Sequence, residues 1–368
     1  MTTVLKAADS AEFLGLVPAL AGFTPRQSIM LVPFASSRAH GAMRIDLPRD
    51  TVEVEEFVDA AVGLVSRVSK TDAVALVVYT DEPPQCTRDG MVLPHTVVVE
   101  DLLSVAMDSG LRIVDALCVM ASGWSSYLDD EPTLGSLDDI PGPPPVPGIA
   151  DVSGDQADGA ELPQVDLAEK ERVGRALHDL TEVLDHERAP RSARANPQAI
   201  NASLLLDDLP LFFETALERP ENLPPFASAA LLWCLNRPTF RDAALVQWAT
   251  DLPTGIEILG AQLAFTHHGT AVPPELGEIF IGQGDAPDAD RLRLALTLAR
   301  NVAARAPRPY RAAPLTVAAW LSWALGRSTH AAHYLEAATE IDPEYSLAQL
   351  LSTLISAAVL PEWTFRRG

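Results

Sequence analysis

Residues 72–79, Asp-Ala-Val-Ala-Leu-Val-Val-Tyr, form a nearly continuous apolar run that is rich in β-branched side chains. This composition is typical of a strand covered on both faces of its sheet, because a strand with one solvated face alternates apolar and polar residues. Helices are predicted on either side, at 54–68 and 95–109, where apolar residues recur with a helical period. Further strands are predicted at 28–34, 42–47 and 111–120, with a short hairpin partner at 124–128. The alternation of strand and helix predicts an α/β domain with a mainly parallel sheet and an added hairpin.

The second half of the chain consists of amphipathic segments that are separated by Pro and Gly. A long, charged helix is predicted at 167–187. Shorter helices are predicted near 197–206, 209–218, 225–235, 239–250, 254–267, 288–305, 312–325, 328–341 and 345–358. This half is therefore expected to be all-helical.

An acidic, Pro-rich stretch separates the two patterns. No Lys or Arg occurs between Arg112 and Lys170, whereas Asp, Glu and Pro recur there. Pro blocks regular structure, and like charges favour an extended, solvated path. We therefore expect an α/β domain over residues 1–128, an acidic Pro-rich linker over 129–165 and an all-helical domain over 166–368.

One hairpin in the helical half has the spacing of a helical repeat. In residues 326–343, the positions that match the second helix of a tetratricopeptide repeat are Gly326, Ala331, Tyr334, Ala338 and the closing Asp342-Pro343. A related pattern occurs earlier, where Ala229, Trp233 and Arg237 match Ala319, Trp323 and Arg327. Since about three repeats are needed for a self-standing array, the pattern predicts a compact helical domain with repeat-like hairpins rather than a superhelix.

Three stretches carry a family resemblance. They are Val17-Pro18-Ala19-Leu20-Ala21-Gly22-Phe23-Thr24-Pro25 followed by Ser28 and an apolar strand, Gly123-Trp124-Ser125-Ser126-Tyr127-Leu128, and residues 314–361. Together they resemble the actinobacterial family catalogued as domain of unknown function 4192, and they span most of the chain. Many members follow the Trp-containing hairpin with a Cys- and Pro-rich turn, where this chain has its acidic segment without cysteine. The resemblance implies kinship and brings no assigned activity with it.

Composition excludes several classes of protein. Fifty acidic residues against 27 Lys and Arg give a net charge of −23, which repels nucleic-acid phosphates and anionic membranes, so direct nucleic-acid binding is not expected. The three cysteines are scattered, which argues against a disulfide framework or a cysteine-rich metal site. Neither a signal peptide nor an apolar run of about 18 residues is apparent, so we expect a cytoplasmic protein without a membrane span.

The sequence contains no recognisable catalytic motif, such as a phosphate-binding loop or a GxSxG elbow, so no catalytic residue, metal or cofactor is predicted. Two functions remain open. The first is a non-enzymatic interaction or scaffold protein whose helical half binds a protein partner, with candidate contacts at Trp233, Trp320, Trp323 and Tyr334. The second is an enzyme or small-molecule sensor with a ligand site beyond the carboxyl ends of the strands. Its candidate residues are Arg26, Ser28, Arg38, Asp81, His95 and Trp124, with Ser28 also placed to bond backbone groups of the preceding turn.

Overall fold

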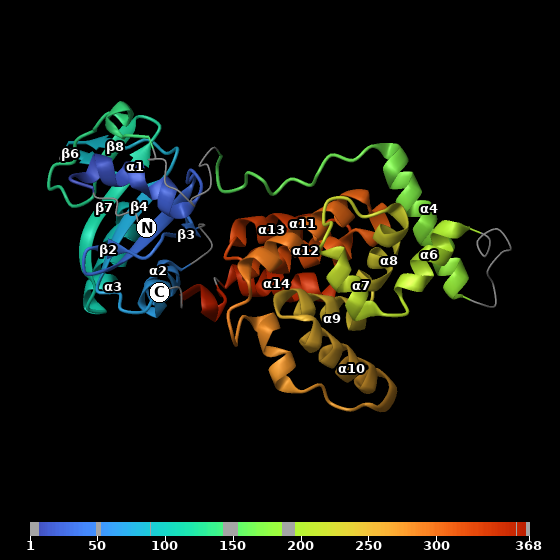
Figure 1. The fold of residues 1–368 in the computed structure, drawn as a ribbon. Helices are drawn as coiled ribbons and strands as arrows, with labels where there is room; N and C mark the ends of the chain where they lie inside the picture. Colours follow the sequence, from blue (N-terminus) through green and yellow to red (C-terminus); the bar gives the residue numbers. More distant parts are fainter. Residues whose placement is uncertain are drawn as a thin grey trace. The chain divides into compact units, whose positions relative to one another are not determined.

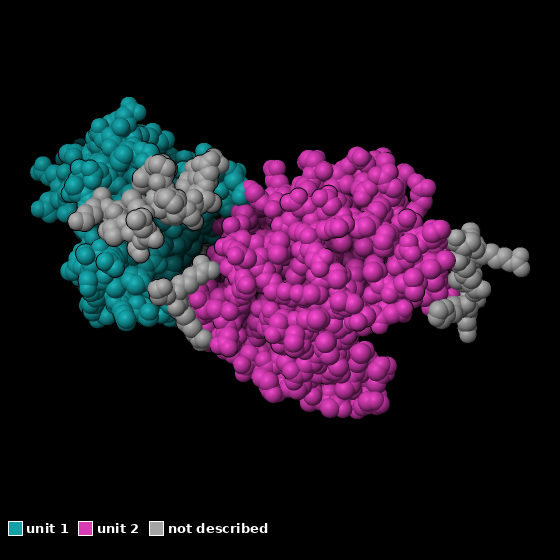
Figure 2. All heavy atoms as spheres, viewed as in Figure 1, with its two compact units in different colours: residues 1–158, 365–368 teal, residues 159–364 magenta. Residues whose placement is uncertain are grey.

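The computed structural model describes residues 7–48, 53–88, 90–142, 154–185, 196–357 and 359–365. The chain divides into two compact units, Met1–Asp158 with Phe365–Gly368, and Gly159–Thr364, which Figure 2 shows in separate colours. The first unit is α/β and the second is helical, so the predicted order of an α/β half and an all-helical half is confirmed (Figure 1). None of the helices in the described residues is long and apolar enough to cross a membrane.

The first unit contains a six-stranded sheet in the order β2-β1-β4-β7-β8, with β3 also paired to β1. Its strands are β1 (Ser28–Ala35), β2 (Arg38–Ala39), β3 (Met43–Asp46), β4 (Ala73–Tyr79), β7 (Arg112–Met120) and β8 (Gly123–Ser126). The quoted run at 72–79 is the central strand β4, whose residues are buried apart from the half-buried Tyr79 at its end. A separate hairpin, β5 (Gln85–Thr87) with β6 (Gly90–Val92), follows β4.

The strand directions differ from the prediction of a mainly parallel sheet. Among the described strands, only β4 and β7 pair in parallel, whereas β1 is antiparallel to both β3 and β4. The reason is that the chain reverses after β1, so the crossover to β4 starts from the returning strand β3. Strands β3 and β4 therefore run in the same direction on opposite sides of β1, and helix α2 (Val54–Arg67) connects them.

Helices cover both faces of this sheet. Helix α1 (Ser10–Ala21) packs on one face through Phe13, Leu14 and Val17. Helices α2 and α3 (Thr96–Asp108) pack on the other face, where they bury a larger apolar cluster. The side chains of β1, β4 and β7 alternate between the two clusters, which explains why the centres of β1 and β4 have no polar residue.

Part of the segment predicted as a linker packs on the first unit. Gly135 forms an isolated bridge with Trp124, and Ile140, next to the short helix η1 (Leu137–Asp139), joins the apolar cluster under α1. Asp155 forms a second bridge with Thr24. Residues 143–153 of the predicted linker lie outside the described residues. The division between the two units falls at Asp158 and Gly159.

The second unit consists of helices joined by short loops and 3₁₀ turns, and every helix predicted for this half is confirmed. They are α4 (Leu167–Leu184), α6 (Pro197–Leu205), α7 (Leu209–Ala216), α8 (Pro225–Leu235), α9 (Pro238–Ala249), α10 (Leu252–His268), α11 (Ala289–Arg305), α12 (Ala312–Ala324), α13 (Ser328–Thr339) and α14 (Ser346–Ser356). Helix α12 lies at the centre, and all of its residues are buried. Asp288 caps α11 by accepting hydrogen bonds from the backbone N–H groups of Asp290 and Arg291, as its position before an apolar segment predicts.

Candidate functional site

The edge of the sheet where β1 begins and β4 ends gathers several of the predicted ligand-binding residues. Because the two strands are antiparallel, Ser28 at the start of β1 pairs with Tyr79 at the end of β4. The residues just outside these strands therefore meet, and the Gln27 side-chain amide donates to Asp81 Oδ2 at 2.6 Å. We call residues 24–28 with 79–82 the strand-end edge.

Arg26 is held at the strand-end edge through its backbone. Its N–H donates to Gln156 Oε1 and its carbonyl accepts from Gln156 Nε2, both at 2.9 Å. Its guanidinium Nε lies 3.9 Å from Asp155 Oδ2, and 72% of the side chain is exposed. An ion pair this exposed contributes little to stability, so the pair of hydrogen bonds to Gln156 fixes the position of the loop. The sequence predicts Gln27 only as part of the turn Thr24-Pro25-Arg26-Gln27, and it gives no sign of the role of Gln156.

Arg38 does not belong to this group. It lies on β2, where it pairs with Ala35 at the far end of β1. Strand β1 has eight residues and so separates Arg38 from the strand-end edge by about 25 Å. The prediction that joined Arg38 to Asp81 assumed that β1 and β4 are parallel, and their antiparallel pairing corrects it.

Ser28 is fully buried, and its hydroxyl has no hydrogen-bond partner. It therefore does not bond the backbone of the preceding turn, which corrects the role predicted for it. Its pairing partner Tyr79 is half-buried, and burial raises the pKa of the Tyr79 phenol. A hydroxyl that solvent cannot reach and that contacts no base is not an activated nucleophile.

His95 lies beside the strand-end edge, whereas Trp124 lies within strand β8. His95 adopts a left-handed backbone conformation before α3, and its Nε2 lies 3.8 Å from Glu82 Oε2. Trp124 exchanges backbone hydrogen bonds of 3.1 and 2.8 Å with Gly135, and the indole lies flat against that glycine. A side chain at Gly135 would overlap the indole ring, so Trp124 anchors the segment that follows the sheet.

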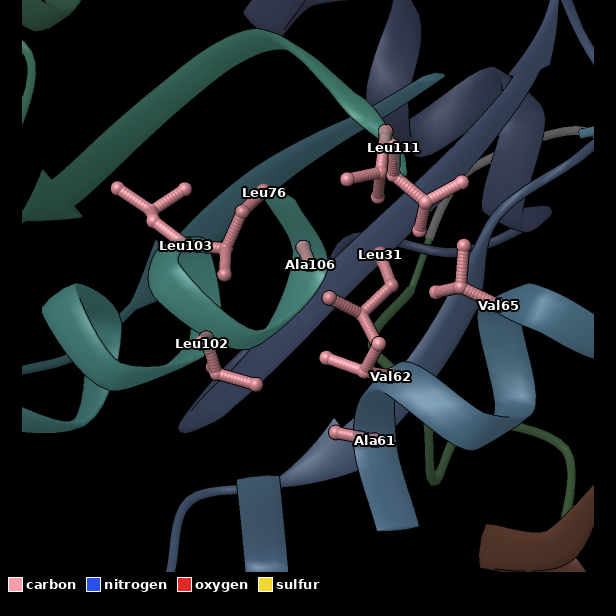
Figure 3. Close-up of a pocket in the computed structure, with 10 residues that line it drawn as sticks. Leu31, Ala61, Val62, Val65, Leu76, Leu102, Leu103, Ala106 and Leu111 are labelled. Atoms are coloured by element: carbon pink, nitrogen blue, oxygen red, sulfur yellow. The ribbon is translucent and has the colours of Figure 1, made fainter. Parts of the chain in front are cut away.

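The remaining reactive groups of this unit are equally enclosed or isolated. Cys118 is buried in the sheet, and burial raises the pKa of its thiol to about 11, which keeps it protonated. A cavity between the sheet and helices α2 and α3 is lined only by apolar side chains, among them Leu31, Val62 and Leu102 (Figure 3). Among the described residues, no group of three or more His, Cys, Asp or Glu is placed to hold a metal ion.

In the helical unit, most of the predicted partner contacts lie inside the core. Trp320 and Trp323 of α12 are fully buried and donate to the carbonyls of Phe280 and Val359 at 3.1 and 2.8 Å. Tyr334 of α13 is also buried. These three side chains determine the packing and have no surface with which to contact a partner directly.

Trp233 is the one predicted partner contact that reaches the surface. It is half-buried and lies between two neighbours, stacked on Phe240 at 5.5 Å with the Arg237 guanidinium 3.6 Å above its ring. These contacts hold the indole in place and leave only part of it exposed.

Helix α10 presents a surface that sequence reasoning missed. Of its 17 residues, only Gly255 and Ile258 are buried. Ile256 and Phe265 are 56% and 54% exposed, although most of the helix is apolar. Leu252, Ile256, Leu259 and Leu263 follow one another at spacings of four, three and four residues, so they form a single stripe along the helix. We call these four residues the α10 stripe; Figure 1 shows α10 beside α9 at the periphery of its unit.

The comparison with protein families gives one match over residues 11–275 and 285–362, to the family described as Domain of unknown function (DUF4192). The chain belongs to this family. No curated protein and no solved structure matches it.

The family match includes both surfaces described above. Its first range begins within α1 and contains the strand-end edge, Trp124 and α10, and its second range contains α11 to α14. The structure explains three features that carry the resemblance. Gly22 ends α1 with a φ of 81°, and Pro25 is a buried residue of the strand-end edge. Gly123 approaches the carbonyl of Gly135 so closely that a side chain there would overlap it.

Proposed function

We propose that the chain is a non-enzymatic interaction protein and that the α10 stripe is the surface that binds its protein partner. The observation that carries this proposal is the exposure of α10. Apolar helices in folded domains normally bury a full face, because about 25 cal/mol is gained for each Å² of apolar surface removed from water. Helix α10 leaves Ile256 more than half exposed and Leu252, Leu259 and Leu263 only partly covered.

The spacing of the stripe favours a helical ligand. Apolar residues at intervals of four and three positions match the pattern with which one helix packs along another. With 17 residues, α10 is about 25 Å long, which is sufficient for four such anchors. A partner that presents an amphipathic helix would therefore cover the stripe.

Charge favours a basic partner over a second copy of the chain. The net charge of −23 makes two copies repel each other. Within α10 there is no Lys or Arg, while Asp251 at its N-cap and Glu257 are exposed acids. A helix whose apolar face is flanked by Lys or Arg would complement this surface and would be attracted over a distance.

The alternative of an enzyme or ligand sensor at the sheet has weaker support. The strand-end edge is closed by its own hydrogen bonds between Gln27 and Asp81 and between Arg26 and Gln156. The cavity beside the sheet offers no polar group to orient a substrate.

The test compares three forms of the full chain as baits in a lysate of the source organism. They are the wild type, the double variant Ile256→Asp/Leu263→Asp, and the control Val97→Asp, which places the same charge on an exposed position of α3. A partner recovered in stoichiometric amount is identified by mass spectrometry, purified and titrated against each form by calorimetry. We expect the double variant to bind about tenfold more weakly or worse, the control to bind like the wild type, and the affinity to fall with salt.

Two results would contradict this proposal. The first is a partner that binds the double variant as tightly as the wild type. The second is a concentration-dependent dimer in light scattering that the double variant abolishes, because the occupant of the stripe would then be a second copy of the chain. Circular dichroism of each variant checks that its helix content is unchanged.

A further inference from the structure

Three arginines of the helical unit lie together. Arg293 and Arg300 are two turns apart on α11 and therefore share a face of that helix. Arg327 lies in the turn between α12 and α13, directly after Gly326, whose φ is 78°. Partial burial, followed by the charges of Arg293 and Arg300, lowers the pKa of Arg327, so the three guanidinium groups are within electrostatic reach of one another.

Two of these arginines have no carboxylate partner. Arg293 is paired with Asp290 at 2.5 Å. No described carboxylate lies within ion-pair distance of Arg300 or Arg327, although the chain carries 50 acidic residues. Like charges that remain together without counter-ions are unfavourable, so the cluster has a cost that a bound anion would remove.

A buried hydroxyl points to the same place. Tyr334 of α13 is only 1% exposed, and its hydroxyl has no hydrogen-bond partner. Arg327 is the N-cap residue of α13 and Tyr334 lies two turns further along, so both are on the same face of that helix. Burial raises the pKa of Tyr334, whereas the charges of Arg300 and Arg327 lower it. An unpaired buried hydroxyl is unfavourable, so this donor is suited to a ligand that binds beside Arg300 and Arg327.

Residues 159–161, which precede α4, also lie beside this cluster of arginines. The Arg300 guanidinium donates to the carbonyl of Glu161, and Ala160 is buried. Gly159 lies against the first turn of α13, where a Cβ would be 3.9 Å from His330. Arg327 occupies the N-cap position of α13 without making a side-chain cap, so the positive end of this 12-residue helix adds to the field.

We propose that Arg300, Arg327 and Tyr334 form a binding site for a phosphoryl group, either free phosphate or a small phosphomonoester. The two unpaired guanidinium groups carry two positive charges, and a phosphoryl group carries about −1.5 to −2 at neutral pH, whereas a carboxylate carries only −1. Guanidinium groups donate in pairs to phosphate oxygens, and the Tyr334 hydroxyl supplies a further donor. This site is independent of the α10 stripe.

The test titrates the full chain with sodium phosphate by calorimetry in a chloride buffer of constant ionic strength. Glycerol 2-phosphate and acetate are titrated in parallel as a phosphomonoester and a monoanionic carboxylate. We expect saturable binding of either phosphate compound at one site. Acetate should bind at least about tenfold more weakly, because it carries a single negative charge and two acceptor oxygens instead of about −1.5 to −2 and three. The compound that binds more tightly identifies the source of the phosphoryl group.

Variants assign the binding to these residues. Arg300→Gln and Arg327→Gln are each expected to lose about tenfold or more in phosphate affinity. Tyr334→Phe is expected to lose about three- to tenfold, while its melting temperature without phosphate stays equal to or above that of the wild type because an unpaired hydroxyl has been removed. Arg219→Gln changes an exposed arginine elsewhere in the unit and serves as the matched control.

Each outcome of these titrations either supports or contradicts the proposed phosphoryl site. Arg327 lies in an exposed turn, so its variant keeps the proposal testable even if Arg300→Gln lowers stability. The proposal is overturned if the folded wild type shows no saturable phosphate binding, if acetate binds equally well, or if Arg327→Gln binds phosphate like the Arg219→Gln control.

Discussion

Helices α10 and α12 are both mostly apolar and belong to the same unit, but they have opposite environments. Every residue of α12 is buried, including Trp320 and Trp323. Helix α10 is longer, yet only Gly255 and Ile258 are buried. Burial of α12 follows from its position, because α8, α11, α13 and α14 all pack against it, whereas α10 packs mainly on α9 and α7.

An apolar helix can be a core helix that the rest of the domain surrounds, or a surface helix with an uncovered apolar side. A helix that is apolar on all sides is stable in water only when neighbours surround it. Helix α12 obtains those neighbours within the chain. Helix α10 has packing neighbours on one side only, so the rest of its apolar surface is available to a partner. The comparison predicts that equivalent changes in the two helices have very different effects on folding stability.

The largest effect is expected in α12. Trp320 is fully buried and donates to the carbonyl of Phe280, so Trp320→Ala leaves a large cavity and an unpaired carbonyl. We expect the free energy of unfolding of the helical unit to fall by about 3–5 kcal/mol, as measured by urea denaturation followed by circular dichroism. A decrease below about 1 kcal/mol would contradict the placement of α12 at the centre of the unit.

A smaller effect is expected where α10 meets α9. A Cβ at Gly255 would lie 2.3 Å from Oε1, 2.6 Å from Cγ and 2.7 Å from Cβ of Gln247. Gln247 is fully buried and donates to the Pro210 carbonyl and to Glu214 at 2.8 and 3.0 Å, so it has little freedom to move. We expect Gly255→Ala to lower the free energy of unfolding by about 1–3 kcal/mol in the same measurement.

Elements whose apolar pattern follows from local geometry are predictable from the sequence, whereas elements that depend on distant contacts are not. The central strand β4 and the helices of the second unit have apolar patterns that local geometry enforces, and all of them were predicted. The direction of β4 relative to β1 was predicted wrongly, because the crossover to β4 begins at the short returning strand β3 and not at β1. The hairpin of β5 and β6 is not among the predicted strands, because three residues are too few to show an alternating pattern.

The candidate sites were less predictable, for reasons of long-range packing. Trp320 and Tyr334 are predicted partner contacts in and beside the repeat-like hairpin, but large aromatic residues also fill cores, and here they do. Helix α10 is less apolar than α12, but which of its apolar residues are exposed depends on neighbours that are distant in the sequence. The cluster of Arg300 with Arg327 was also missed, since it forms only when α11 packs beside the turn before α13.

Gly260→Ala is the matched control for Gly255→Ala. Gly260 lies on the same helix, and a Cβ there would have no atom within 4 Å. Because Ala has a higher helix propensity than Gly, we expect this substitution to raise the free energy of unfolding by about 0.5–1 kcal/mol. A decrease would mean that the exposed side of α10 is covered by another part of the chain.

The smallest effect is expected on the α10 stripe itself. Ile256→Ala removes a side chain that is 56% exposed, so we expect the free energy of unfolding to change by no more than about 0.5 kcal/mol. Ile258→Ala makes the same change two residues away at a position that is 1% exposed, and we expect it to cost about 2–5 kcal/mol. Equal losses in the two variants would show that α10 is enclosed on both sides, which would remove the distinction from α12 and with it the surface assigned to a partner.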